Sequence, residues 1–191
     1  MLTARLRLRD FEPEDLPGTR RYGLDPRVVA QVPHELRSEQ ELTKHFSAVL
    51  NARILRPRRS FELAVEVRRS GTLIGTCELS RLPGGGAEIG YMLAHRYWGR
   101  GYGTEIAIAL RDAAFRELKV TRLRALIAIE NDASRRVLVK AGLHWAALRR
   151  RHLHAKGRWW DCDEYELLQR DWTPAPAAGI ARADTVARRR P

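Results

Sequence analysis

The chain has 191 residues, 44% of them hydrophobic and 30% charged, so it is long and apolar enough to bury a core as one domain. It has no run near the ~18 apolar residues of a membrane span, and the opening MLTARLRLRD lacks the apolar block of a secretory signal. The 35 Lys and Arg residues exceed the 23 Asp and Glu residues, which gives a net charge of +12 and raises nucleic acid as a partner.

The basic residues are scattered in short clusters, so solvated faces are their commoner destination. We therefore expect a soluble cytoplasmic protein that requires neither nucleic acid nor a membrane. Cys77 and Cys162 stand far apart without a CxxC partner, which excludes a disulfide framework and a cysteine zinc site. His152 and His154 share one strand face, but no acidic or Cys partner stands at ligand spacing, so no metal site is predicted.

The first half of the chain predicts a strand followed by two helices. Residues 5–10 alternate apolar and basic side chains, which indicates a strand with one solvated face. Pro13 suits the first turn of a helix ending near Tyr22, and Ser38 with Glu41 forms a capping box for a second helix. The apolar face of that second helix is predicted to consist of Leu42, Phe46, Val49, Leu50 and Ile54.

Three antiparallel strands are predicted next. Residues 61–67 and 73–80 are separated by Arg-Ser-Gly, which indicates a hairpin. A third strand over 87–93 follows a flexible run of three glycines.

The second half alternates helix and strand. In chain order it predicts a helix over 102–119, a strand over 122–129, a helix over 131–141, and two strands over 144–154 and 159–169. From residue 173 the chain is rich in Ala, Pro and Arg without periodicity, which predicts a disordered tail (173–191) after a single domain (1–172).

This order of elements predicts an α/β (α+β) fold, with a mixed, mostly antiparallel central sheet and helices on both faces. Ligands of such sheets gather where a strand ends and a helix begins, here between Leu93 and Tyr102. That junction reads HRYWGRGYGTE, with Gly99, Gly101 and Gly103 at alternate positions. Such glycines let backbone N–H groups turn inward to hold a pyrophosphate, although a plain tight turn explains three glycines equally well.

Longer segments make the pattern specific. EIGYMLAHRYWGRGYGTE, followed by IENDASRRVLVKAGL, resembles the GNAT superfamily of acetyl-CoA-dependent N-acetyltransferases. The segments LRLRDFEPEDL, TLIGTCELS and GRWWDCDEYELLQRDW are similar to its RimJ/RimL-type branch of ribosomal-protein alanine and serine N-terminal acetyltransferases. The resemblance covers about residues 5–172 and implies a GNAT-type fold with acetyl-CoA (coenzyme A) as cosubstrate and no metal.

The resemblance also implies which residues bind acetyl-CoA. Its pyrophosphate loop Q/R-x-x-G-x-G/A, extended by one residue, falls on Trp98, Gly99, Arg100, Gly101, Tyr102, Gly103 and Thr104, and Trp98 departs from the Gln or Arg form. In the family the strand before the loop splays from its neighbour, and backbone N–H groups near Met92 and Leu93 would meet the thioester carbonyl. Asn131 resembles the residue that holds the pantetheine, and it is also a favoured helix N-cap.

Two catalytic residues are predicted. Glu88 lies on the strand before the loop among apolar neighbours, which suits a general base, although a structural glutamate is an alternative. The position of the usual superfamily acid, a Tyr, holds Leu138, which cannot donate a proton. Ser134 matches an N-x-x-S form in which the hydroxyl bonds the CoA sulfur, and a Ser that caps helix amides is the alternative.

Several other residues surround this predicted site. Glu105 complements the helix dipole, and Arg135, Arg136 and Lys140 either bind the CoA 3′-phosphate or form a solvated face. One of three tryptophans is predicted to line an acceptor pocket, the candidates being Trp145, Trp159 and Trp160.

The predicted function is therefore acetyl transfer from acetyl-CoA to a primary amine, with a protein N-terminal α-amine favoured. A small-molecule amine such as an aminoglycoside, a polyamine or an amino-acid-like compound is the alternative. A chain of charge +12 without an obvious acidic cluster is a poor electrostatic host for the polycations among these. A basic nucleic-acid-binding or ribosome-binding protein is the alternative from another class, and a homodimer is left open.

Overall fold

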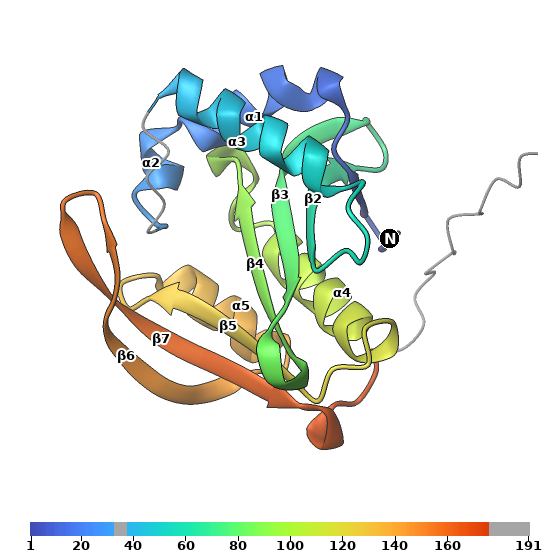
Figure 1. Ribbon diagram of the computed structural model, residues 1–191, viewed down its shortest axis with the longest axis vertical. Helices are drawn as coiled ribbons and strands as arrows, with labels where there is room; N and C mark the ends of the chain where they lie inside the picture. The colour runs from blue at the N-terminus through green and yellow to red at the C-terminus, as the bar shows by residue number, and fades with distance from the viewer. Residues whose placement is uncertain (33–37, 176–191) are drawn as a thin grey trace, which may run out of the picture.

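The computed structural model describes residues 1–32 and 38–175 and contains one seven-stranded sheet in the order β1-β2-β3-β4-β5-β7-β6 (Figure 1). The strands are β1 (Leu6–Asp10), β2 (Ser60–Val67), β3 (Thr72–Arg81), β4 (Gly86–Leu93), β5 (Arg122–Ala128), β6 (His144–Ala155) and β7 (Arg158–Leu168). Neighbouring strands are antiparallel except β4 and β5, which are parallel. The predicted mixed, mostly antiparallel sheet is confirmed.

Helices cover both faces of the sheet, as predicted. They are α1 (Leu16–Gly23), α2 (Pro26–Val29), α3 (Glu39–Ala52), α4 (Tyr102–Arg116) and α5 (Asp132–Lys140). On β2, Ala64 packs with Phe46 of α3, whereas its neighbours Leu63 and Val65 belong to the cluster that includes Ile106 of α4. Because successive strand side chains point to opposite faces, α3 and α4 lie on opposite sides of the sheet.

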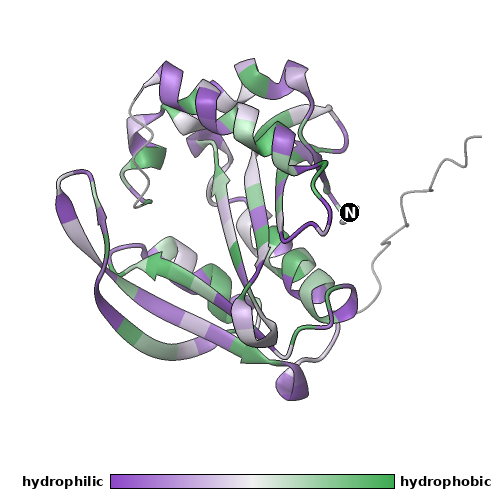
Figure 2. Ribbon diagram, in the orientation of Figure 1, coloured by the Kyte–Doolittle hydropathy of each residue, from purple (hydrophilic) through white to green (hydrophobic). Residues whose placement is uncertain are grey.

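The larger core lies between the sheet and α4. Leu6 of β1, Ile74 of β3, and Ile106 and Leu110 of α4 are fully buried there. In Figure 2 the exposed hairpin of β6 and β7 carries strongly hydrophilic stretches, while α4 is mostly apolar or neutral in colour. No helix in the described part of the chain is long and apolar enough to cross a membrane.

Between β1 and β2 the structure differs from the predicted helices in two places. The short helix α2 was not predicted, although its start is encoded locally: the Asp25 side chain accepts a hydrogen bond from Arg27 N (3.0 Å), and Pro26 takes the first position. Ile54 was predicted on the apolar face of α3, but that helix ends at Ala52 and the Ile54 side chain is 69% exposed. The Ser38–Glu41 capping box is confirmed.

Two predicted elements end earlier than expected. Helix α4 ends at Arg116 rather than at Lys119, which has a φ of 55° that no α-helix accommodates. Strand β5 ends at Ala128 rather than at residue 129. The predicted disordered tail lies mostly outside the described residues, from 176 onward.

The two parallel strands at the centre diverge. Only the first three residues of β4, from Gly86 to Glu88, pair with β5, and the pairing ends at Arg124. Beyond this point β4 continues to Leu93 and β5 to Ala128 as separate arms of a V, which Figure 1 shows between the two ribbons. The splayed edges expose backbone groups in the middle of the sheet.

Candidate active site

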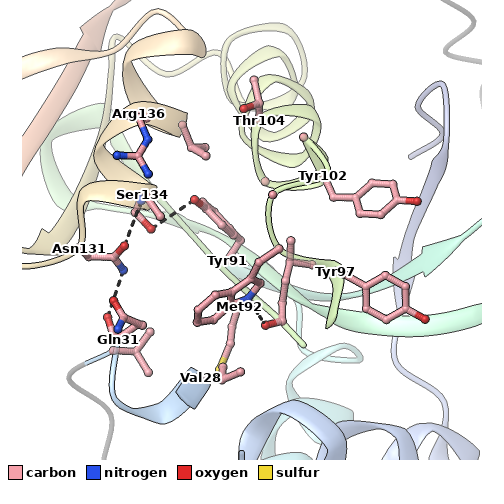
Figure 3. Close-up of a pocket in the computed structure, with 18 of the residues that line it drawn as sticks. Val28, Gln31, Tyr91, Met92, Tyr97, Tyr102, Thr104, Asn131, Ser134 and Arg136 are labelled. Carbon is pink, nitrogen blue, oxygen red and sulfur yellow. Dashed lines mark hydrogen bonds between the residues drawn. The ribbon is translucent and has the colours of Figure 1, made fainter. Parts of the chain in front are cut away.

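A cavity of about 310 Å³ lies at the open end of this V, next to the start of α4 (Figure 3). We call it the α4-side cavity. The predicted site residues that line it are Met92, Leu93, Trp98, Gly99, Gly101, Tyr102, Gly103, Thr104, Asn131 and Ser134. The rest of its lining consists of Val28, Gln31, Val32, Tyr91, Tyr97, Ala133, Arg136, Val137 and Lys140. The structure thus brings the two motifs of the sequence, the glycine loop and the N-x-x-S helix start, to one cavity.

The glycine loop ends in a helix N-terminus that faces this cavity. Gly99 and Gly101 have φ of 72° and 77°, in the left-handed region that favours glycine. The first helical hydrogen bond of α4 runs from Glu105 N to Gly101 O (3.1 Å). The amides of the first turn therefore have no acceptor within the helix, and together with the helix dipole they suit an anion.

Glu105 fixes this turn of α4 to the N-terminal segment. Its carboxylate accepts hydrogen bonds from Thr3 Oγ1 (2.5 Å), Arg5 N (2.7 Å) and Arg5 Nε (2.7 Å). Burial alone would raise the pKa of the Glu105 carboxyl, but the hydrogen bonds from Thr3 and Arg5 outweigh it and lower the pKa below its ordinary value. Glu105, which was predicted to complement the helix dipole, therefore also connects the first turn of α4 to the N-terminal segment.

Tyr91 of β4 reaches across the cavity to α5. Its ring lies against Gly103, where an added Cβ would come within 3.1 Å of the ring, so a larger residue here would have to displace the ring by a few tenths of an ångström. Its hydroxyl donates a hydrogen bond to Ser134 Oγ (3.3 Å), as Figure 3 shows. Burial raises the pKa of Tyr91, so the phenol keeps its proton at neutral pH.

The start of α5 is capped by Asn131 as the sequence predicted. Asn131 Oδ1 accepts a hydrogen bond from Ser134 N (3.0 Å), and Asn131 Nδ2 donates to Gln31 O (3.2 Å) in the segment after α2. Lys156 Nζ, at the turn between β6 and β7, donates to the carbonyls of Val29 and Val32. Two contacts from distant elements therefore hold the α2 segment against the cavity.

The register of β3 and β4 decides which backbone groups face the open edge. Ala94 N donates to Ile74 O (2.8 Å), and Leu82 N donates to Gly86 O (2.9 Å). Because antiparallel pairs alternate, Met92 exchanges its hydrogen bonds with Thr76 on β3. The amides of Tyr91 and Leu93 point toward the V instead.

The sequence expected free amides near Met92 and Leu93, and of these two the register leaves Leu93 on the open edge. Met92 meets the cavity with its side chain, as Figure 3 shows. Trp98 Nε1 donates to Leu93 O (2.8 Å), so the residue that departs from the family's loop ties the loop to this strand.

Of the four basic residues predicted near the site, two line the α4-side cavity and two do not. Arg136 and Lys140 of α5 line it, and among its described lining residues there is no Asp or Glu. Arg135 turns away to Asp132 (2.7 Å) and Ile129 O (2.9 Å). Arg100 lies outside the lining, with its guanidinium 5.7 Å from the ring centre of Tyr97. A phosphate contact for Arg100 stays a prediction.

Glu88 is placed at the closed end of the V. Its carboxylate accepts a hydrogen bond from Arg124 Nε (2.8 Å) on β5, and its side chain is 34% exposed. It does not belong to the lining of either cavity described here. Its role as general base stays a prediction.

A second cavity, of about 340 Å³, lies on the other side of β4 beneath α3. We call it the α3-side cavity. It shares three residues with the first cavity: Val32, Tyr91 and Met92. The remaining lining residues are Glu41, His45, Glu62, Thr76, Cys77, Glu78 and Gly90. Two openings thus meet at the same stretch of β4.

Three glutamates line the α3-side cavity. Glu62 of β2 stands directly opposite Glu78 of β3, which stands opposite Gly90 of β4. Glu41 and His45 approach from α3, and His45 Nε2 lies 3.1 Å from Glu62 Oε1. Among the described lining residues there is no Lys or Arg. The expectation that the chain lacks an acidic cluster is wrong, because folding gathers carboxylates that are 16 or more residues apart in the sequence.

The three tryptophans proposed for an acceptor pocket line neither cavity. Trp145 Nε1 donates to Asp163 Oδ1 (2.9 Å), Trp160 Nε1 donates to Ala155 O (2.9 Å), and Trp159 packs against His154.

Among the described residues, no group of three or more His, Cys, Asp and Glu side chains is arranged to hold a metal ion.

Tyr91, His45 and Glu62 line the cavities but are not among the site residues predicted from the sequence. Tyr91 carried a usable signal, because an aromatic residue on the strand before the loop alternates with apolar positions that face α4. His45 and Glu62 carried none, since their proximity depends on how α3 packs on β2.

Comparison with known proteins agrees with this geometry. A family model described as acetyltransferase (GNAT) domain matches residues 5–144. The relative p20 of Bacillus licheniformis, named an uncharacterized N-acetyltransferase, is 29% identical over 174 residues, which are 90% of this chain and 97% of that protein.

Solved structures share the fold over nearly the whole described chain. Ribosomal-protein-S5-alanine acetyltransferase from Vibrio fischeri superposes with a TM-score of 0.75 at 19% identity, covering 91% of this chain and 98% of that one. Spermidine N-acetyltransferase from Vibrio cholerae, in complex with CoA and spermine, gives a TM-score of 0.74 at 20% identity, covering 88% and 98%.

Proposed function

The chain belongs to the GNAT acetyltransferase family, and from this premise we propose that it transfers the acetyl group of acetyl-CoA to the α-amine of a protein N-terminus. We place it in the RimJ/RimL-type branch of the family. The observation that carries the proposal is the V between β4 and β5, which ends at a glycine-rich helix start and meets a second, acidic cavity.

The residues of the α4-side cavity fit acetyl-CoA. The first-turn amides of α4 suit a diphosphate, and Arg136 and Lys140 add the positive charge that a further phosphate needs. The open edge at Tyr91 and Leu93 offers backbone donors and acceptors to an extended amide chain such as pantetheine, as in strand addition. When bound, acetyl-CoA supplies the activated acyl group.

Ser134 is the proposed hydrogen-bond donor to the CoA sulfur. Its oxygen accepts the Tyr91 hydroxyl hydrogen, so its own hydroxyl hydrogen remains available for a second partner in the cavity. A hydroxyl that donates to a developing thiolate stabilises it, because charge-assisted hydrogen bonds are the stronger kind. Tyr91 is then a positioning residue that fixes the orientation of the Ser134 hydroxyl.

The α3-side cavity is the proposed entrance for the acceptor. An N-terminal α-amine is an ammonium near neutral pH, and Glu41, Glu62 and Glu78 provide a favourable potential for it. The cavity also has room for a small terminal side chain such as Ala or Ser. The three carboxylates favour a polyamine as a second candidate acceptor, since each additional ammonium finds a counter-charge.

The test is thiol release from acetyl-CoA with a panel of acceptors. The panel contains a peptide beginning with Ala, one beginning with Ser, the same peptides with blocked N-termini, spermidine and an aminoglycoside. We expect turnover with the free peptides and none with the blocked ones, with the acetyl group located on the α-amine by mass spectrometry. Turnover with spermidine alone would establish the second candidate, and turnover with none would contradict the proposal.

A further inference from the structure

The α3-side cavity contains a histidine, His45, that the proposed function does not use, next to the carboxylate of Glu62. We propose that His45, held by Glu62, accepts the proton that the acceptor ammonium must lose before it attacks the thioester. The inference rests on the acetyltransferase activity proposed above and assigns the base to a residue of α3.

The geometry of the pair defines which atom receives the proton. His45 Nε2 lies 3.1 Å from Glu62 Oε1, and Thr76 Oγ1 donates to the same carboxylate oxygen (3.4 Å). In the neutral imidazole the hydrogen therefore sits on Nε2, where it is donated to Glu62. Nδ1 is left as the acceptor, because the partner of one ring nitrogen sets the state of the other.

The pair faces the stretch of β4 where the acyl group is expected. Gly90 and Met92 form the opposite wall of the cavity, and Gly90 has no side chain to block an approaching amine. His45 is 46% exposed on its side chain, so water or an acceptor can reach it. A general base acts within hydrogen-bond reach of the proton that it accepts or through one water molecule.

The surrounding charges favour the protonated imidazole once it forms. The groups that line the cavity with His45 are Glu41 of α3, Glu62 of β2, Glu78 and Cys77 of β3, and Tyr91 of β4. The hydrogen bond to Glu62 is the main cause that raises the pKa of His45 above 6.5, and burial opposes it. A base whose pKa lies near the operating pH is the efficient kind.

The proton balance of the reaction is complete with this assignment. The ammonium gives one proton to His45 Nδ1, directly or through water, and the free amine forms the C–N bond to the acyl carbon. The C–S bond breaks while Ser134 donates a hydrogen bond to the developing thiolate, and the second nitrogen proton then passes to this thiolate to give the free thiol. His45 then returns its proton to solvent.

Glu88 is the competing base, and the structure distinguishes the two. The Glu88 carboxylate is engaged by Arg124 (2.8 Å) and lies outside the cavity lining, whereas His45 lines the cavity and is held with Nδ1 available.

The experiment measures the pH profile of kcat with saturating acetyl-CoA and the best acceptor among the Ala peptide, the Ser peptide and spermidine. His45→Gln is expected to lower kcat at pH 7 by about 10²-fold or more, with acetyl-CoA affinity unchanged. Glu62→Gln removes the group that raises the pKa of His45, so the ascending limb of the profile is expected to move to lower pH. A merely structural role for the pair would not move this limb.

The matched control is His144→Gln. His144 of β6 lies 3.7 Å from Glu166 of β7, outside both cavities, and its replacement is expected to leave the profile in place. An unchanged kcat in His45→Gln, or a limb that stays in place in Glu62→Gln, would overturn the inference. Loss of activity in Glu88→Gln with full activity in His45→Gln would return the role to Glu88. A wild-type protein inactive on every acceptor would instead contradict the proposed function.

Discussion

The two cavities on either side of β4 differ in the residue types and in the sign of the charges that line them. The α4-side cavity is lined by glycines, by apolar and aromatic side chains and by two basic side chains, without an acidic residue among its described lining. The α3-side cavity is formed by side chains, among them three glutamates and a histidine, without a basic Lys or Arg in its described lining. The opposite signs of charge separate a site suited to phosphates from a site suited to an ammonium.

The two cavities also differ in how far apart their residues lie in the sequence. The α4-side cavity owes its anion site to one continuous segment, in which strand β4, the glycine loop and helix α4 follow each other. The α3-side cavity depends on a helix packing over three strands whose residues are far apart in sequence. Substitutions in the first should therefore affect cofactor binding, and substitutions in the second should affect the acceptor step.

The largest expected effect is the loss of CoA binding in Gly99→Asp. The new carboxylate would stand at the cavity where phosphates are proposed to bind, and we expect affinity for CoA to fall by about 10²-fold or more through charge repulsion. Calorimetric titration of CoA measures this.

Gly84→Asp is the matched control for Gly99→Asp. Gly84 and Gly99 have φ of 76° and 72°, and neither would place a Cβ within 4 Å of other atoms, so both variants put a side chain at a left-handed φ without a clash. Gly84 lies in the turn before β4, outside both cavities, and we expect its variant to bind CoA like the wild type. Equal CoA affinity in both variants would remove the glycine loop from the site.

Ser134→Ala is expected to have the next largest effect. Loss of one hydrogen bond to a developing thiolate costs about 1.5–3 kcal/mol, which corresponds to a kcat lower by about 10-fold to 10²-fold. Because no titrating group is removed, the decrease should be the same at every pH, in contrast to the variants of the α3-side cavity. An unchanged kcat, or a decrease confined to one pH range, would contradict the proposed role of Ser134.

Tyr91→Phe is expected to have a smaller effect that depends on Ser134. The phenol only orients the Ser134 hydroxyl, so its removal should lower kcat by a few-fold in the wild type. In the Ser134→Ala background the same substitution should have almost no further effect, because the two residues act as one unit. Additive effects in this double-mutant cycle would show that Tyr91 acts independently.

The smallest expected effect is a change in the melting temperature of the Glu105→Gln variant. The lowered pKa of Glu105 means that its charged form stabilises the fold above the ordinary carboxyl pKa, and that this stabilisation is lost as pH falls through the lowered value. Glu105→Gln should therefore lower the melting temperature at pH 7, and the difference from the wild type should shrink below about pH 4.

Glu14→Gln, at an exposed position of the first turn of η1 (Pro13–Asp15), is the control for this comparison. Its melting temperature should follow that of the wild type across the same pH range. A Glu105→Gln difference that is constant with pH would contradict the assigned linkage.

Much of the α4-side cavity could be predicted from the sequence. The alternating glycines before a helix and the Asn131–Ser134 spacing are short-range patterns, and the structure brings both to one cavity. The register of β4 could not be predicted to one residue, and it is the register that directs the amides of Tyr91 and Leu93, rather than that of Met92, to the open edge.

The α3-side cavity could not be predicted for a different reason. Glu62 and Glu78 stand opposite each other only because β2 and β3 pair in one register, and His45 reaches them only because α3 crosses above them. The helix itself was predicted from its capping box, but neither its packing direction nor its end at Ala52 follows from local signals. The net charge of +12 gave no sign of the acidic cavity, because a sum over the whole chain carries no information about where carboxylates cluster in the fold.

A crystal structure with bound CoA tests the division between the two cavities most directly. We expect its pyrophosphate about 3 Å from the first-turn amides of α4, and its pantetheine along the open edge of β4 at Tyr91 and Leu93. The carboxylates of Glu62 and Glu78 should have no contact with it. A pantetheine that runs through the α3-side cavity, or a pyrophosphate bound away from the glycine loop, would contradict the account.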